Sequence, residues 1–166
     1  MTVHEALRAW ARGVYATEAA VELLVHAFDG RFAEEGWSWV RTEPNGGAWI
    51  DATRLSEHHA DLSGGERRVL SLVAALLDPD QPVDIGDIAS GVDRCHLDLV
   101  LAAIAHAGGS HQHAAIIRDH EAGTARMIRQ GSLHPWPETA AEERPRTDGA
   151  VEQLGSLVRP RGPVQM

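Results

Sequence analysis

The feature that most constrains the fold of this chain is a pair of segments with helical hydrophobic periodicity in its middle. Residues 63–78 open with a serine three positions before a glutamate, the spacing of a helix capping box, and close on an Asp-Pro pair. Residues 93–107 show a similar pattern and end at two glycines. Both segments predict amphipathic helices that bury one apolar face: Val69, Leu72, Val73 and Leu76 in the first, and Leu97, Val100, Leu101 and Ile104 in the second.

Shorter patterns flank these two segments. Apolar stripes before Gly30 predict two N-terminal helices, and alternation within residues 37–51, around a Pro-Asn-Gly-Gly cluster, predicts a small β-hairpin. A short helix is expected at 84–90, and residues 113–119 and 124–130 are typical of two strands that form a second hairpin. We therefore expect an α+β protein that is predominantly helical.

The chain is expected to form one globular domain followed by a tail. Residues 1–134 make up the domain, with a helical and hairpin part in 1–60 and a tri-helical unit with the second hairpin in 61–134. In residues 135–166 proline, glutamate, arginine and glycine dominate and apolar periodicity fades, which predicts a flexible tail. Truncation after His134 should then leave thermal stability nearly unchanged.

The amino-acid usage of the chain excludes several classes of enzyme. All 15 basic residues are arginine, whereas a phosphate-binding loop of the GxxxxGK[ST] type and Schiff-base catalysis both need a lysine. The single cysteine, Cys95, excludes an intramolecular disulfide and a cysteine-rich zinc site, and we expect it to be a half-buried small hydrophobe. No serine elbow, paired-carboxylate signature or dinucleotide motif is present. We therefore expect neither catalysis nor a cofactor.

Charge and hydropathy indicate an acidic protein of a bacterial cytoplasm. The net charge is −9, and the residues before Pro135 include 19 acidic and 11 basic side chains. Such a surface repels duplex DNA unless its arginines gather on one face. No stretch approaches the roughly 20 apolar residues that cross a membrane, and the first residues lack the pattern of a signal peptide. The absence of lysine together with abundant alanine, glycine and arginine is typical of a high-GC genome.

Residues 62–68, Leu-Ser-Gly-Gly-Glu-Arg-Arg, resemble the signature loop of ABC-type ATPases, where a Ser-Gly-Gly turn at a helix start contacts nucleotide phosphate. No phosphate-binding loop precedes them, and residues 83–87 lack the Asp-Glu pair that such enzymes place before their serine-rich segment. A helix capping box accounts for the motif without a nucleotide. The ATPase interpretation is therefore rejected.

Residues 63–130 resemble a winged helix-turn-helix in the order of their expected elements: helix, short helix, longer helix and two-stranded wing. This resemblance implies DNA binding, with Arg94 reading bases and Arg118, Arg126 and Arg129 contacting phosphates. The rest of the expected reading helix lacks the side chains that recognise base edges. On charge grounds we favour a winged-helix-like unit that contacts protein, and we keep the DNA-binding regulator as the alternative.

Three of the five tryptophans, Trp37, Trp39 and Trp49, lie in the predicted N-terminal hairpin. Their large rings are expected to cover the helical core. The alternative is that they form a ligand or partner surface, because aromatic side chains are common in binding sites.

Four of the ten histidines cluster at His106, His111, His113 and His120. On a strand, His111 and His113 would point to the same side, a spacing that zinc sites use. His106, Asp119 or His120 would supply a third ligand. The alternative is a group of solvated loop histidines. A metal-binding protein with ligands His111, His113 and His120 is therefore our second alternative function.

Because no catalytic constellation is visible, the sequence favours a non-catalytic regulatory or protein-interaction protein. We expect it to act by docking a protein partner or by forming a homo-oligomer, without membrane contact.

Overall fold

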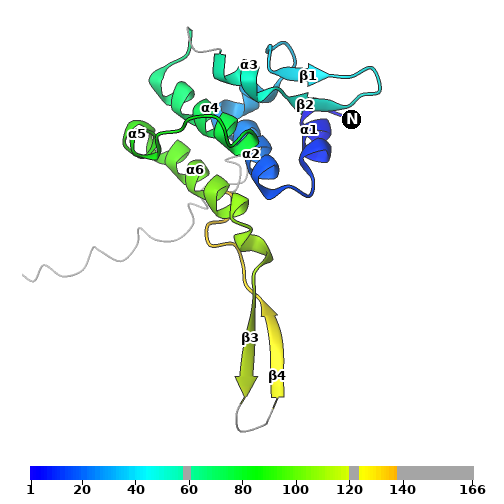
Figure 1. Ribbon diagram of the computed structural model, residues 1–166, viewed down its shortest axis with the longest axis vertical. Helices are drawn as coiled ribbons and strands as arrows, with labels where there is room; N and C mark the ends of the chain where they lie inside the picture. Colours follow the sequence, from blue (N-terminus) through cyan, green and yellow to red (C-terminus); the bar gives the residue numbers. More distant parts are fainter. Residues whose placement is uncertain (58–60, 120–123, 138–166) are drawn as a thin grey trace, which may run out of the picture.

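The computed structural model describes residues 1–57, 61–119 and 124–137. It is a mostly helical α+β fold with two small antiparallel hairpins, which confirms the predicted fold class. Figure 1 shows a compact group of helices from which the second hairpin projects. We call residues 1–113 the helical body and the hairpin of residues 114–129 the arm.

The elements follow one another in the predicted order. The helical body contains α1 (Val3–Ala11), α2 (Tyr15–His26), η1 (Ala27–Ala33), β1 (Val40–Thr42), β2 (Ala48–Ile50), α3 (Ala52–Glu57), α4 (Gly64–Leu77), α5 (Ile85–Gly91), α6 (Arg94–Ala107) and η2 (Ser110–Gln112). The arm consists of β3 (Ala114–Asp119) and β4 (Thr124–Arg129). The bounds of α4, α5, α6 and both arm strands agree with the prediction to within one residue, whereas α3 and the two short 3-10 helices were not predicted.

Helix α2 is the centre of the helical body. Its buried residues are Ala19, Ala20, Val21, Leu23 and Leu24. These positions cover most of the helix circumference, so α2 packs against α1, α4 and α6 at once. The β1–β2 hairpin packs against α1, and α3 packs against α4. The core therefore surrounds one helix that has little amphipathic character.

Local capping determines where two of the helices begin. Thr2 and Glu5 form a capping box at α1, and Ser63 and Glu66 form another at α4. In each box the hydroxyl accepts a backbone N–H, and the glutamate accepts the N–H of the capping residue. The box at α4 accounts for the segment that resembles the ATPase signature loop.

The chain reverses direction after α2 in a left-handed turn. Phe28, Asp29 and Gly30 have φ values of 52°, 58° and 74°. A Cβ atom at Gly30 would lie 2.9 Å from the backbone oxygen of Val25, so this position requires glycine. The turn places the buried ring of Phe32 against the core.

The buried face of α6 differs from the prediction. Val100 is buried as expected, but Leu101 and Ile104 are 44% and 43% exposed. Helix α6 buries Ala102 and Ala103 beside Val100 and packs against α2. Small residues allow the two helices to approach closely, which the larger side chains would prevent. The exposed face carries what we call the α6 stripe: Leu97, which is half-buried, and Leu101 and Ile104.

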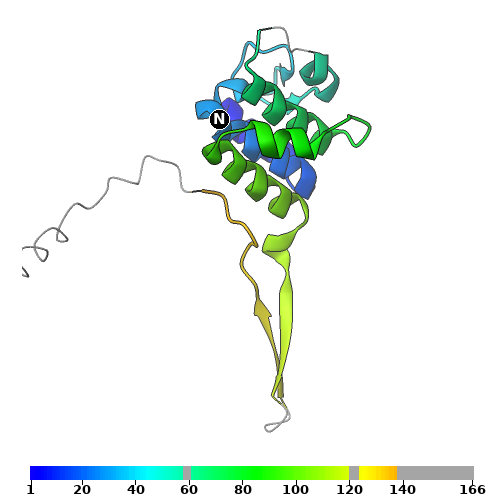
Figure 2. The same ribbon diagram turned by 90° about the vertical axis from the view of Figure 1, so that its left-hand side faces the viewer.

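The arm leaves the C-terminal end of α6 through η2 and points away from the helical body in both views (Figures 1 and 2). Its strands pair antiparallel from Ala114 opposite Arg129 to Asp119 opposite Thr124. The order of elements is that of a winged helix, but the hairpin extends beyond the helices instead of lying beside them.

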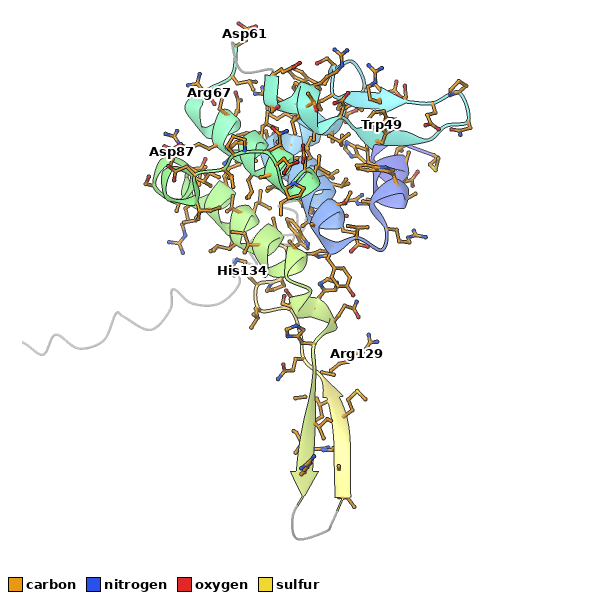
Figure 3. All side chains as sticks on the ribbon, viewed as in Figure 1. Trp49, Asp61, Arg67, Asp87, Arg129 and His134 are labelled. Carbon is orange, nitrogen blue, oxygen red and sulfur yellow. The ribbon has the colours of Figure 1, made fainter. Side chains whose placement is uncertain are left out.

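After β4 the chain returns to the body. The ring of His134 lies 2.7 Å from a carboxylate oxygen of Asp98 on α6, at the junction seen in Figure 3. Trp136 is half-buried, stacks on His26 with ring centroids 5.5 Å apart, and donates to His106. Packing therefore continues past the predicted domain end at His134. From residue 138 on, the predicted tail lies outside the described residues.

Candidate functional site

The arm presents apolar side chains on both of its faces. Ile116 and Met127 oppose each other across the hairpin and are 66% and 74% exposed. Ile117 is 46% exposed and lies on the other face with the half-buried Ile128, because successive strand residues point to opposite sides. A surface of this kind on a projecting element is typical of a protein interaction site.

The arginines proposed for DNA binding do not form one surface. Arg118 and Arg129 share the arm face of Ile116, whereas Arg126 lies on the opposite face. Arg94 is at the start of α6, and that helix of 14 residues is about 21 Å long. Since the arm begins at the other end of α6, the base-reading and phosphate-contacting candidates lie at least about 20 Å apart. All four are exposed, and none forms an ion pair with another described residue.

Charge is distributed unevenly between the two regions. Residues 1–113 contain 17 acidic and 8 basic side chains, whereas residues 114–129 contain three arginines against one aspartate and one glutamate. The acidic residues are dense in residues 78–98, around α5 and the first half of α6, where six aspartates accompany one arginine. The arm is therefore basic in relation to the helical body.

The structure corrects the proposed metal ligands. His111 lies in η2 and His113 follows it, so the two are not on a strand as predicted. His113 is exposed, and it is not a member of the group of possible ligands that contains His111. His120 lies outside the described residues. His106, one of the three candidates for the third ligand, stacks on His111 with ring centroids 4.2 Å apart.

Glu18 completes a group that the sequence analysis missed. One ligand atom each from Glu18, His106 and His111 lies within 4.8 Å of the other two, and we call these three residues the histidine cluster. Glu18 comes from α2, and its Oε2 lies 3.0 Å from Nε2 of His106. Tyr15 packs edge-on against both imidazole rings. No local signal links residues 18 and 106, since the contact depends on how α2 and α6 pack.

Hydrogen bonding and burial shift the pKa values of two members of the cluster. The backbone N–H of Gly13 and the ring of His106 lower the pKa of Glu18. Burial lowers the pKa of His111, and repulsion from His106 adds to this effect when the His106 ring is protonated. These shifts favour an ionised carboxylate at Glu18 and a neutral imidazole at His111, the forms that bind metal ions.

A pocket of about 200 Å³ opens beside the cluster. Glu18 and His106 line it together with Arg8, Arg12 and Glu22. Arg8 donates from Nε and from a terminal nitrogen to the two carboxylate oxygens of Glu22, at 2.7 and 2.8 Å. The pocket thus has charged walls of both signs.

The three tryptophans of the proposed partner surface occupy different environments. Trp39 is fully buried, and its indole donates to the backbone oxygen of Phe32, so it is part of the core. Trp37 is half-buried and stacks on Trp39 with centroids 4.5 Å apart. Trp49, labelled in Figure 3, is half-buried and lines a pocket of about 180 Å³ together with Trp10. Of the three tryptophans expected to cover the helical core, Trp37 and Trp39 contribute most to this cover.

A larger pocket of about 350 Å³ lies at the start of α4, lined by Arg67, Arg68 and Asp87 among others (Figure 3). Arg68 donates to both carboxylate oxygens of Asp87, at 2.9 and 2.8 Å, which raises the pKa of Arg68 and neutralises its charge locally.

Cys95 is exposed and not half-buried as expected.

No protein-family model matches this chain, and no curated protein or solved structure is significantly similar to it. Among the described residues, every helix is too short or too polar to span a membrane.

Proposed function

We propose that this chain is a non-catalytic interaction protein that pairs with a second copy of itself through the arm. The observation that carries this proposal is the exposure of Ile116, Ile117 and Met127 on a hairpin that projects from the body. The excluded enzyme classes and the lack of lysine chemistry agree with a binding role.

A two-stranded hairpin is at best marginally stable in water on its own. Within the part of the chain that the structure describes, each arm strand also has one edge without a hydrogen-bonded neighbour strand, which favours association with another chain. Because the arm points away from its own helices, its apolar residues cannot be covered by the body from which it extends. Among the described residues no element covers them, so we infer that a second molecule supplies the cover.

The α6 stripe is the surface of a second copy that fits the arm best. Leu97, Leu101 and Ile104 are spaced i, i+4 and i+7, which gives one continuous apolar ridge. The six-residue strands of the arm are about 20 Å long, and α6 is about 21 Å long. The two surfaces therefore match in length.

Charge and symmetry favour the same pairing. Arg118 and Arg129 lie on the arm face of Ile116, whereas residues 78–98 carry six aspartates, so laying this face along the partner's α6 brings opposite charges together. In an antiparallel two-fold dimer each arm covers the partner's α6 stripe, and both contacts form at once.

The proposal is tested by measuring the mass of the full-length chain by light scattering during gel filtration. Wild type should be a dimer. The double variants Ile116→Asp with Met127→Asp, and Leu101→Asp with Ile104→Asp, should both be monomers, because each places charge in the same interface.

Trp10→Asp is the matched control, since Trp10 is 42% exposed, apolar and lines a pocket with Trp49 at the β1–β2 hairpin. It should leave the dimer intact. A wild-type monomer, or a dimer that survives both double variants with normal circular dichroism, would overturn the proposal.

DNA binding is the competing outcome for the same arm. If Arg126 and Arg129 contact phosphates, affinity for random duplex DNA should fall steeply with salt. Sub-micromolar binding at physiological salt, abolished by Arg126→Ala with Arg129→Ala, would favour the winged-helix regulator. We expect no such binding, because the body is acidic and Arg94 is remote from the arm.

A further inference from the structure

The histidine cluster lies where the arm joins the helical body. Glu18 comes from α2, His106 from the last turn of α6, and His111 from η2, immediately before the arm. Two imidazoles and one carboxylate are a common zinc ligand set. The geometry points to a site for a divalent transition-metal ion, with Zn²⁺ as the preferred ion, formed by these three side chains.

The hydrogen bond between His106 and Glu18 marks the position of the ion. The indole N–H of Trp136 can only donate, and it donates to Nδ1 of His106 over 3.3 Å. The neutral ring therefore keeps its proton on Nε2, which donates to Oε2 of Glu18. An ion bound at Nε2 would lie where this hydrogen bond now is, and the ring would then carry its proton on Nδ1 instead.

His111 supplies an independent indication. Its Nδ1 is buried and has no hydrogen-bond partner among the described residues. A buried nitrogen without a partner is uncommon and suggests an absent ligand. Tyr15 makes a T-shaped contact with this ring, with centroids 5.0 Å apart, and limits its rotation.

The distances require only a small adjustment. The three ligand atoms lie within 4.8 Å of one another. Two nitrogens about 2.1 Å from a tetrahedral zinc ion are about 3.4 Å apart. Closing this difference needs a movement of about 1 Å, which side-chain rotation in half-buried residues can supply.

Three protein ligands leave one coordination position for water or a small anion. Glu18 and His106 also line the pocket that contains Arg8, Arg12 and Glu22, so the site adjoins a pocket with charges of both signs. Metal binding would also tie η2 to α2 and thereby hold the base of the arm. It would displace the indole of Trp136, because Nδ1 of His106 becomes a donor.

The test is calorimetric titration of ZnCl₂ into the chelator-treated, full-length protein. Wild type should bind one ion per chain. His111→Ala should weaken affinity at least tenfold, the loss that removal of even an outer-shell partner causes. Glu18→Gln, which preserves the shape of the side chain, should also weaken it. His113→Ala is the matched control, because His113 is exposed and outside the cluster. This variant should bind Zn²⁺ with the affinity of wild type.

Tryptophan fluorescence provides a second measurement. Zinc should change the emission of wild type but not that of Trp136→Phe, and this variant should bind zinc about fivefold more tightly because it lacks the competing donor. Absence of binding in wild type, or equal losses in His111→Ala and His113→Ala, would overturn the site. The arm variant Ile116→Asp with Met127→Asp should still bind zinc, so failure of the dimer proposal and failure of this one are distinguishable.

Discussion

The helical body and the arm place their large apolar residues in opposite environments. In the body, leucines from several helices are fully buried: Leu7, Leu23, Leu24, Leu55 and Leu70. In the arm, Ile116, Ile117 and Met127 face solvent. The difference follows from architecture, because helices around α2 cover one another while a two-stranded sheet has no second layer. The body thus buries its own large apolar residues, whereas the arm leaves them exposed, and this difference is the basis of the proposed dimer.

The largest expected effect is a difference in free energy of unfolding between a core variant and an arm variant. Leu23→Ala should lower the free energy of unfolding by about 3 kcal/mol, because it leaves a cavity beside the central helix. Ile117→Ala in the arm should change it by less than about 0.5 kcal/mol. Urea unfolding at a protein concentration where the monomer dominates measures both. Equal losses would show that the arm belongs to the body's cooperative unit.

Acid should destabilise the body through Glu22. Burial by itself would raise the pKa of Glu22, but hydrogen bonds from Arg8 and His26 lower it to about 2. Because the pKa of Glu22 is lower in the folded state, its ionised carboxylate stabilises the protein above the unfolded value of 4.5. This stabilisation is lost as pH falls toward 2. The free energy of unfolding should therefore drop by about 2 kcal/mol between pH 5 and 2. Glu22→Gln should lack this share of the pH dependence, and an unchanged slope would refute the assignment.

The smallest effect concerns where the body ends. Truncation after Pro137 should leave stability unchanged, whereas truncation after His134 should cost about 1 kcal/mol, because it removes the half-buried Trp136. Thermal unfolding of the two truncated chains gives the comparison. Identical melting temperatures of the two truncated chains would show that the domain ends at His134.

Signals that act over a few residues were sufficient to predict most elements of the fold. The capping boxes at Thr2 and Ser63 and the glycines after Ala107 mark helix ends through local hydrogen bonds. The arm strands were found from β-branched residues and turn composition in the same way.

Contacts between distant segments were not predictable. Periodicity shows that α6 has apolar positions, but packing on α2 decides that Val100 is buried and Leu101 exposed. Glu18 and His106 meet only because α2 and α6 pack together. The site residues missed by sequence reasoning were those joined by tertiary contacts.

The contact between the arm and α6 of a second copy is tested most directly through Cys95. This single cysteine is exposed in the first turn of α6, about 20 Å from the arm's origin. Within one chain it lies about 40 Å from the exposed Ala125 near the arm tip. In the antiparallel dimer the tip of one arm reaches the start of the partner's α6. Under mild oxidation, Ala125→Cys should therefore give a disulfide-linked dimer on a non-reducing gel.

Adding Cys95→Ser to that variant should abolish the cross-link, and wild type should not form one. A cross-link that persists without Cys95 would place the arms tip to tip. Absence of any cross-link in Ala125→Cys would contradict docking of the arm on α6.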